Sequence, residues 1–383
     1  MKKSPTQSRE RVKGGTPLQS AGAAPLLESR GKASGGVKGQ RPLGSSINTR
    51  KLYEEVTNSI AKKGQGRNSL AGSRGSAPWA HLMKGKKAMR LSTSTCMYFN
   101  RPDGTKASIL DSVRTLGQAG YRVLDMNFHD LSVFDTPFKT PHWETLIHQA
   151  KDIADEMGIE FSQGHLHFYN FCDPNTPDKE FLDELIRRGI EGGRILGIKW
   201  LVIHAATDFD SVTPVRDSKR KTIEYLKPRI ELAGKYGVGI AVENLWEENI
   251  APKRRYCVTA EELGDLVDSL PYDNVGCCWD VEHASICHQD QRKALQYLGK
   301  RLKATHISDY NSIKNDHILP FSGLSDWTEI TDALRLAQYD GDFTYETHNF
   351  TAKMPDEVIM SGLKHSIDIG NLLIDMIQGG HQA

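Results

Sequence analysis

The hydrophobic pattern of the chain changes near residue 90. From there to residue 378, short apolar and β-branched runs alternate with longer stretches in which apolar residues recur at the period of a helix. The short runs predict eight strands, at residues 90–97, 122–127, 159–165, 199–204, 238–243, 274–280, 302–306 and 343–346. The stretches between them predict helices that include 106–119, 142–157, 178–196, 218–236, 259–270, 326–338 and 355–377.

Glycines near helix ends support this division. They occur in "QAGY" (118–121), "EMGI" (156–159) and "KYGV" (235–238), in each case just before a predicted strand. Eight strand–helix alternations over this length predict an α/β fold, the (β/α)8 TIM barrel, which typically needs ~250 residues. A doubly wound open sheet is the alternative. It is disfavoured because no GxGxxG or P-loop sequence follows any of the strands.

Residues 1–88 have a different composition. They are rich in Gly, Ser, Lys, Arg and Gln, and such a segment buries too little apolar surface to offset its chain entropy. We therefore expect a disordered, low-complexity basic tail at 1–88, with a lone amphipathic helix at 51–63 as the one candidate element, and a barrel domain at 89–383. Met89, which leads directly into the first strand, is an alternative start of the protein.

Charge and cysteine content argue against a general nucleic-acid binder and against a protein held together by disulfides. Lys and Arg total 49 against 48 Asp and Glu, so the chain lacks the bulk positive charge of a general nucleic-acid binder. The six cysteines form no CxxC pair, which favours buried thiols in a reducing compartment. No apolar run approaches the ~20 residues that span a bilayer, and the N-terminus lacks the apolar core of a secretory signal. We expect a cytoplasmic protein with no membrane partner; the sequence leaves a homo-oligomer open.

Several predicted strands end in a residue that can bind a metal or exchange a proton. In a barrel the carboxyl ends of all strands surround one mouth, so residues far apart in sequence would converge there. In chain order these residues are His165, His204, Glu243, Asp280 with His283, His306 and Glu346, and the loop after the seventh strand adds Asp309, Asp316 and His317.

The last four strands predict a metal site. They end in Glu243, Asp280, His306 and Glu346, and although one such residue alone could simply cap the next helix, four in succession favour a shared role. Three carboxylates drawn into one cavity would repel one another without a cation. Two Glu, one Asp and one His suit Mn²⁺, Mg²⁺ or Co²⁺, and further imidazoles would favour Zn²⁺.

Histidines near the same mouth are candidates for contacting a substrate. His283 lies one helical turn after Asp280 and could reach either a substrate or a second metal. His165 and His204 are candidates for the cavity wall, and His167 is an equal one. A single histidine of this kind is more often a hydrogen-bonded core residue.

The remaining candidates carry less weight. Trp246 and Trp279 could pack on a sugar face near the mouth, although buried aromatic residues usually belong to the core. Asn127 and Asp125, in the second strand, are weaker site candidates. The pair Arg254–Arg255 could bind a phosphate, but a solvated loop is the favoured interpretation.

These motifs carry a resemblance to a known group of proteins. "AVENL", "CCWDVEHA", "THISDY", "NDHILPFSGLSDW" and "YET" resemble the xylose isomerase-like TIM barrel superfamily, in particular its sugar phosphate isomerase/epimerase group, over about residues 90–378. The resemblance implies that Glu243, Asp280, His306 and Glu346 are the metal ligands. It also implies that Glu243 and Glu346 act as acid and base on opposite faces of a bound ketose, and that His283 touches a substrate hydroxyl or carbonyl.

The expected function follows from these roles. We expect a divalent-metal-dependent isomerase or epimerase of a sugar or sugar-like ketone, which abstracts a proton next to a carbonyl through a metal-stabilised enediolate. His165, His204, His283, His317 and Trp246 are the expected substrate contacts, and a small sugar is the expected partner. A non-catalytic carbohydrate-binding barrel is disfavoured because all four ligands are present.

Two related branches remain alternatives. One dehydrates inositol-derived ketones with the same metal site, and nothing in the sequence separates it from epimerisation. The other contains apurinic-site endonucleases with three zinc ions. The loop Asn315-Asp316-His317 departs from the Asp-spacer-His pattern of that branch, and "PFSG" replaces the glycines expected after it. We therefore do not expect nucleic acid as a substrate.

Overall fold

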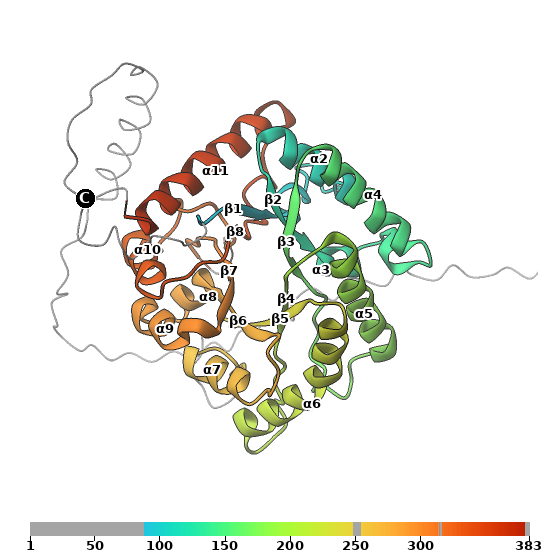
Figure 1. The fold of residues 1–383 in the computed structure, drawn as a ribbon, viewed down its shortest axis with the longest axis vertical. Helices are drawn as coiled ribbons and strands as arrows, with labels where there is room; N and C mark the ends of the chain where they lie inside the picture. The colour runs from blue at the N-terminus through green and yellow to red at the C-terminus, as the bar shows by residue number, and fades with distance from the viewer. Residues whose placement is uncertain (1–87, 248–253, 313, 315, 380–383) are drawn as a thin grey trace, which may run out of the picture. The chain divides into compact units, whose positions relative to one another are not determined.

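The computed structural model describes residues 88–247, 254–312, 314 and 316–379 (Figure 1). Apart from residue 88, the predicted tail at 1–88 and its candidate helix at 51–63 lie outside the described residues.

Eight parallel strands form one sheet that curls into a barrel, with the order β7-β6-β5-β4-β3-β2-β1-β8 (Figure 1). The strands are β1 Leu91–Ser94, β2 Val123–Asn127, β3 Glu160–His165, β4 Trp200–His204, β5 Gly239–Glu243, β6 Val275–Asp280, β7 Leu302–His306 and β8 Phe343–Tyr345. A bridge between Ile307 and Tyr345 closes the ring between β7 and β8. There, Ile307 N donates to Thr344 O at 2.9 Å and Glu346 N donates to Ile307 O at 3.0 Å. The predicted (β/α)8 barrel is confirmed.

Side chains of each strand alternate between the two faces of the sheet. Val202, Ala241, Cys278 and Ala304 pack together inside the barrel, against Trp200. Their neighbours along the strands, such as Ile203, Val242 and Cys277, belong to the larger core between sheet and helices. Both faces are buried, so the strands read as nearly continuous apolar runs. Small inward side chains suit the interior of an eight-stranded barrel, which has room for little else.

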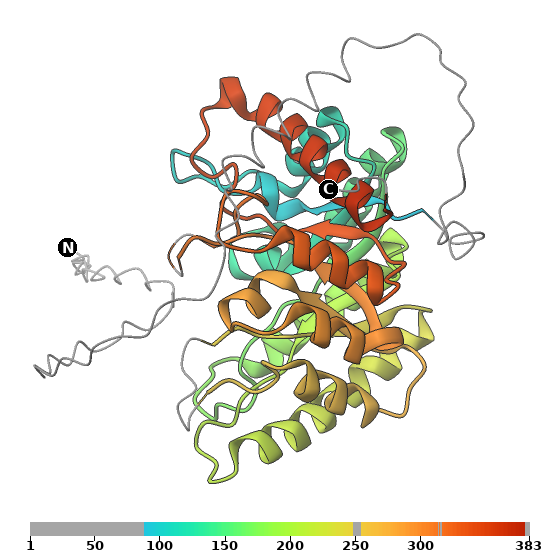
Figure 2. The same ribbon diagram turned by 90° about the vertical axis from the view of Figure 1, so that its left-hand side faces the viewer.

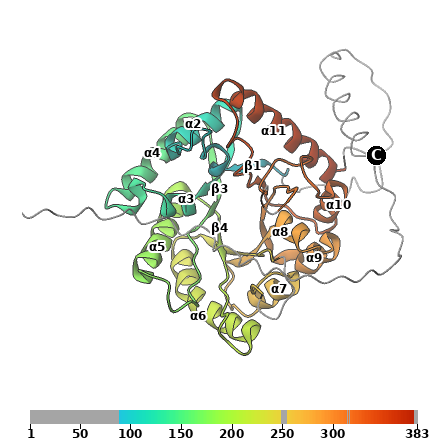
Figure 3. The same cartoon turned by 180° about the vertical axis from the view of Figure 1, so that it is seen from behind.

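Helices surround the strands, as views from the two ends show (Figures 1 and 3). They are α2 Ile109–Ala119, α3 Phe128–Val133, α4 Trp143–Glu156, α5 Lys179–Leu196, α6 Pro214–Lys235, α7 Ala260–Asp268, α8 Val281–Ile286, α9 Gln291–Leu298, α10 Trp327–Leu336 and α11 Asp356–Ile377, with 3-10 turns η1 Thr95–Tyr98, η2 Pro137–Lys139 and η3 Gly299–Arg301. From the side, α10 and α11 run next to each other along the barrel (Figure 2). No helix among the described residues is both long and apolar enough to cross a membrane.

The structure differs from the sequence-based expectation in short segments. The first strand ends at Ser94 instead of residue 97, because the Ser94 side chain accepts from Cys96 N and the chain turns into η1. Three helices that were not predicted, α3, α8 and α9, have only 6, 6 and 8 residues. Two turns or fewer do not give a readable helical period. Of these, α3 and α8 begin directly after β2 and β6, and both border the candidate site.

Candidate active site and metal centre

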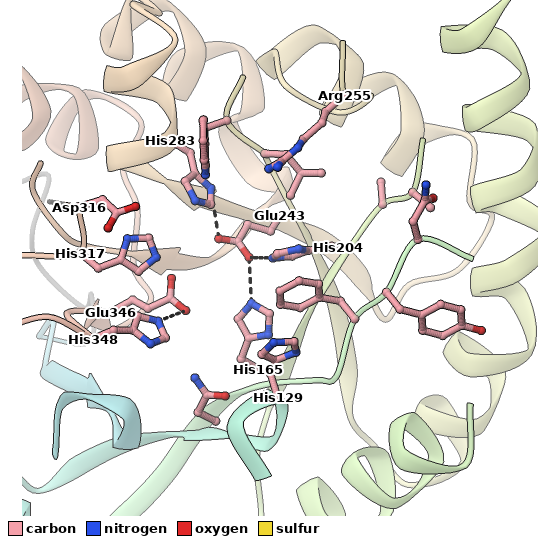
Figure 4. A pocket seen from close by; sticks show the side chains of 18 of the residues that line it. His129, His165, His204, Glu243, Arg255, His283, Asp316, His317, Glu346 and His348 are labelled. Atoms are coloured by element: carbon pink, nitrogen blue, oxygen red, sulfur yellow. Dashed lines mark hydrogen bonds and ion pairs between the residues drawn. The ribbon is translucent and has the colours of Figure 1, made fainter. Parts of the chain in front are cut away.

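A cavity of about 670 Å³ lies at the carboxyl ends of the strands, where side chains from β2 to β5 converge with side chains from the segments that follow the strands (Figure 4). This volume lies within the range of small-molecule sites, roughly 300–1,000 Å³. The predicted site residues His165, His204, Glu243, Trp246, His283, His317 and Glu346 all line it.

The four predicted metal ligands lie together. Glu243, Asp280 and His306 are the last residues of β5, β6 and β7, and Glu346 directly follows β8. One ligand atom from each lies within 4.8 Å of all the others. His306 Nδ1 is 2.9 Å from Glu243 Oε1 and 3.2 Å from Glu346 Oε2. Strand register accounts for part of this convergence, because Asp280 pairs with His306 across β6 and β7.

All four side chains are buried, and two of their polar atoms have no hydrogen-bond partner among the described residues: Asp280 Oδ2 and His306 Nε2. Burial raises the pKa of Asp280 to about 7, although His283 acts in the opposite direction. Unpartnered buried polar atoms of this kind cost free energy unless a ligand satisfies them. Three carboxylates and one imidazole around one point form an oxygen-rich donor set, so these residues fit a divalent cation.

The groups around His306 favour its protonated form. Burial opposes protonation of its ring, but Cys278, Glu346 and Glu243 raise its pKa well above the usual range. The proton on this imidazole partly neutralises the two glutamates. A metal ion and this proton therefore compete for the same carboxylates, as is general for metal sites.

Glu243 contacts two further imidazoles through its other carboxylate oxygen. Oε2 lies 3.2 Å from His165 Nε2 and 2.9 Å from His204 Nε2. His165 Nδ1 also lies 2.9 Å from Leu166 O. Both nitrogens of His165 face oxygen atoms; burial opposes a charge on this ring, but Glu243 raises its pKa. Burial lowers the pKa of the neighbouring His204 to about 4.

His317 is held by a residue that sequence reasoning did not select. Glu282, buried on α8, accepts from His317 N at 2.7 Å and faces His317 Nδ1 at 2.7 Å. Burial opposes a charge on His317, but the Glu282 carboxylate raises the pKa of this imidazole to about 9. Since Nδ1 is occupied, Nε2 is the ring nitrogen that His317 can offer to a substrate.

His283 has a similar arrangement near His317, with the two ring centroids 6.1 Å apart. Its Nδ1 lies 2.8 Å from Asn244 O, and 3.7 Å from both Glu243 Oε1 and Asp280 Oδ2. The hydrogen bond to Asn244 O places the proton of the neutral ring on Nδ1. Nε2 is then the nitrogen that remains for a substrate.

Several lining residues were missed from the sequence. His129 and Asp130 follow β2 on α3, and His348 lies two residues after Glu346, with Nε2 3.4 Å from Glu346 Oε1. Phe168 stacks between His129 and His204, with ring centroids 3.9 and 3.8 Å away. The available signal was position: each histidine lies two or three residues after a strand's carboxyl end. The unpredicted helix α3 concealed His129.

Other candidates have structural roles. Trp279, considered as a wall residue, is fully buried in the core, where its Nε1 donates to Gln291 Oε1 at 2.8 Å. His167 is buried against His129, with ring centroids 5.2 Å apart, and burial lowers its pKa to about 4. It is not among the residues that line the cavity in the described part of the chain. Asp125 is buried in the barrel below the mouth, whereas Asn127 lines the cavity.

The two loop arginines have different surroundings. Arg254 forms two bonds to Glu262, from NH1 to Oε2 at 3.0 Å and from NH2 to Oε1 at 2.5 Å. Arg255 is exposed, as a solvated loop predicts, but it also lines the cavity, with its guanidinium 5.0 Å from the centre of the Trp246 ring.

Comparison with known proteins places the chain in a family. The family model described as xylose isomerase-like TIM barrel matches residues 113–368. The uncharacterized protein y4fM of Sinorhizobium fredii is 29% identical over 209 residues, which are 54% of this chain and 65% of that protein, just under two thirds of its length. The uncharacterized protein MJ1311 of Methanocaldococcus jannaschii is 26% identical over 210 residues, 53% of this chain and 68% of that protein.

Solved structures show the same fold. A D-tagatose 3-epimerase-like protein superposes with a TM-score of 0.60 at 18% identity, over 76% of this chain and 99% of that one. A D-psicose 3-epimerase gives 0.58 at 15% identity, over 76% and 100%. The 3-keto-D-glucoside 4-epimerase of E. coli gives 0.55 at 18% identity, over 73% and 99%. From the family model, which matches most of the barrel, we conclude that the chain belongs to the xylose isomerase-like TIM barrel family.

Proposed function

We propose that this protein is a divalent-metal-dependent isomerase or epimerase of a sugar or a sugar-like ketone. The observation that carries the proposal is the convergence of Glu243, Asp280, His306 and Glu346 in the mouth of the barrel. Structural likeness to sugar 3-epimerases and a 4-epimerase supports the substrate class. The fold itself hosts many chemistries, so the argument depends on the site.

The four residues would hold one cation, with Mn²⁺, Mg²⁺ or Co²⁺ as the best match to their oxygen-rich set. A bound divalent cation would supply Lewis-acid polarisation of a carbonyl and its neighbouring hydroxyl. Glu243 Oε1 and Glu346 Oε2 face His306, at the centre of the set.

The second oxygen of each glutamate faces histidines other than His306, and we assign proton transfer to this oxygen. Glu243 Oε2 faces His165 and His204, and Glu346 Oε1 faces His348. In the proposed reaction one glutamate removes the proton next to the carbonyl and the other returns a proton to the opposite face. General acid–base catalysis of this type contributes about 10²–10⁴-fold in rate.

The cavity wall supplies the contacts that would orient the substrate. His283 and His317 each have Nδ1 engaged by the protein, which fixes the ring and directs Nε2 to a ligand. As an imidazolium, His317 is a donor to an oxygen that gains negative charge during proton abstraction. Trp246 offers an aromatic face to the apolar side of a sugar.

Glutamine variants of the two glutamates test the proposal. We expect Glu243→Gln and Glu346→Gln each to lower kcat by at least about 10²-fold on ketoses assayed with Mn²⁺, because an amide cannot accept the proton. Circular dichroism and the melting temperature should show a folded barrel. The control is Glu224→Gln, an exposed residue on α6. Substantial turnover by either glutamine variant would remove that residue from the mechanism.

Two alternatives share this site. Dehydration of an inosose would use the same residues, and the appearance of an unsaturated product distinguishes it from epimerisation. A multi-zinc apurinic-site endonuclease is favoured by one observation, because Glu243 with His165 and His204 forms a second group of potential ligands. Metal analysis of the purified protein separates the cases: one ion per chain fits the sugar enzyme, and three zinc ions with cleavage of an abasic oligonucleotide fit the endonuclease.

A further inference from the structure

We propose that the substrate carries an anionic group, either a phosphate ester or a carboxylate, and that this group binds the guanidinium of Arg255 at the mouth of the cavity. The inference extends the proposed ketose activity. That the anion is part of a substrate rests on this proposed function. Binding of the anion itself depends only on the geometry around Arg255.

Arg255 reaches the same cavity as the metal ligands. It follows β5 along the chain and lines the cavity together with Glu243 and His283. Its guanidinium points inward, to the side of the cavity where these two residues lie (Figure 4). The residue is exposed, so a ligand in the cavity can contact it. A cation–π contact with Trp246, at 5.0 Å, holds the side chain in this direction.

The two arginines of this loop differ in their partners among the described residues. The adjacent Arg254 is fixed by its two bonds to Glu262. In contrast, Arg255 forms no ion pair with any carboxylate of the described residues. Glu247, which lies near, accepts from the Arg255 backbone N at 3.3 Å instead. One arginine of the pair therefore stabilises the loop, and the other presents an uncompensated positive charge to the cavity.

The backbone on either side of Arg255 is anchored. Tyr256 N donates to Thr207 Oγ1 at 2.8 Å, which ties this loop to the loop after β4. Leu245 N donates to Cys257 O at 2.9 Å, which ties it to the end of β5. A guanidinium on an anchored backbone loses less entropy when it binds a ligand, so the site is pre-organised.

Charge and shape both select an anion. A guanidinium is always charged in a protein, and its planar fork matches phosphate and carboxylate oxygens in a bidentate manner. Glu243 and Glu346 line the same cavity, and Asp280 lies buried next to them. An anionic sugar would bind with its reactive carbons at these residues and its charged end at Arg255.

Paired substrates test this inference. The assay compares a ketose phosphate and a ketohexuronate with their neutral ketoses, with Mn²⁺, in wild type, Arg255→Ala and Arg255→Lys. Arg216→Ala is the matched control, because it removes one positive charge from the 76% exposed Arg216 on α6. We expect Arg255→Ala to lower kcat/KM for the anionic substrate by about 10- to 100-fold, mainly through KM, while the neutral ketose changes by less than about twofold. Arg255→Lys should retain part of the preference.

The ketose phosphate and the ketohexuronate distinguish the two anions. The anion that Arg255 binds is the one carried by the substrate whose turnover falls in Arg255→Ala. A wild type that prefers neutral ketoses, with Arg255→Ala affecting neutral and anionic substrates equally, would overturn the inference and leave the proposed function intact. Calorimetric titration with inorganic phosphate gives a readout independent of turnover. Weaker phosphate binding in Arg255→Ala but not in Arg216→Ala supports the anion site even if no ketose reacts, whereas equal affinity in all three proteins overturns it.

Discussion

Asp309 follows β7, and both of its carboxylate oxygens accept hydrogen bonds from the loop before α10. Its Oδ1 accepts from Tyr310 N at 2.9 Å and from Ser325 N at 3.1 Å. Its Oδ2 accepts from Gly323 N at 2.9 Å and from Trp327 Nε1 at 3.1 Å. The side chain is fully buried and is not among the described residues that line the cavity. Asp309 therefore organises the loop between β7 and α10 and has no oxygen left for a cation.

Replacing Asp309 should destabilise the protein without removing a ligand of the metal. We expect Asp309→Ala to lower the free energy of unfolding by about 3 kcal/mol or more, because four donors lose a charged acceptor and buried hydrogen bonds to a charge are worth about 1.5–3 kcal/mol each, not additively. Asp309→Asn should lose less. Urea unfolding followed by tryptophan fluorescence measures the change.

The control for this change is Asp316→Ala in the same loop. Within the part of the chain that the structure describes, the Asp316 side chain accepts one bond, from Asn349 Nδ2 at 3.3 Å, so the expected effect is within about 0.5 kcal/mol. Equal unfolding midpoints for the Asp309→Ala and Asp316→Ala variants would contradict the structural role of Asp309.

Residue type and position predicted that the four candidate ligands converge, but not which groups surround them. The convergence of Glu243, Asp280, His306 and Glu346 follows from barrel topology once the strand ends are known. The structural role of Asp309 could not be predicted from its position in the same way. Whether a carboxylate meets a cation or several backbone N–H groups depends on the path of the following loop, which has no periodic signal.

At the scale of elements, α5 shows how an outer helix is tied to the barrel. Glu184 pairs with Arg187 at 2.6 Å and with Arg188 at 2.9 Å. Arg188 NH1 also donates to Phe138 O at 2.8 Å and to Thr140 O at 2.9 Å, in the segment that follows α3. The charged side of α5 thus fixes a neighbouring loop, while its other side packs into the core.

The ion pairs of Glu184 predict a pH dependence of stability. Arg187, and to a lesser extent Arg188, lower the pKa of Glu184 to about 2, against the effect of partial burial. The pKa of an unfolded glutamate is about 4.3. Because the folded value is the lower one, the stabilisation is present above pH ~4.3 and is lost as pH falls toward 2.

We therefore expect Glu184→Gln to cost less than about 1 kcal/mol at pH 6, since the pair is partly exposed to solvent. The difference between wild type and variant should shrink to zero as pH falls toward 2. Urea midpoints measured from pH 6 downward give the difference, with Glu224→Gln, at an exposed ion pair of 3.3 Å, as the control. A difference that does not change with pH would show that Glu184 acts through something other than its charge.

The elements themselves were predictable where they are long. The predicted strand ends at residues 165, 204, 243, 280 and 306 coincide with those of β3 to β7. Strands of a barrel alternate small inward and larger outward side chains, both apolar, and such runs end sharply at polar residues. The short helices α3 and α8 are capped by Asn127 and Asp280. The sequence pattern alone does not distinguish a helix cap from a site residue at these positions.

At the scale of the whole molecule, the barrel gathers like charges at one end. The carboxylates of Glu243, Asp280 and Glu346 meet in a buried space, and each was brought there by a different strand. Their mutual repulsion opposes folding, and a ligand that binds only the folded arrangement offsets it.

Metal addition should consequently raise the melting temperature. We expect Mn²⁺ at about 100 times its dissociation constant to stabilise metal-depleted protein by about 2.7 kcal/mol. This corresponds to an increase of roughly 5 °C in Tm, measured by differential scanning calorimetry. The increase should be lost in Asp280→Asn and His306→Asn but kept in Glu224→Gln. An undiminished increase in the two ligand variants would place the ion elsewhere.

The closing contact of the ring has a consequence for motion. Every other pair of neighbouring strands is joined by a ladder, whereas β7 and β8 are joined by the single bridge between Ile307 and Tyr345. His306 and Glu346 lie on the two sides of this seam. Local opening of the barrel should start there, and an ion bound by residues on both sides would hold the two strands together. Loss of the ion should then accompany faster hydrogen exchange of the backbone amides between β7 and β8.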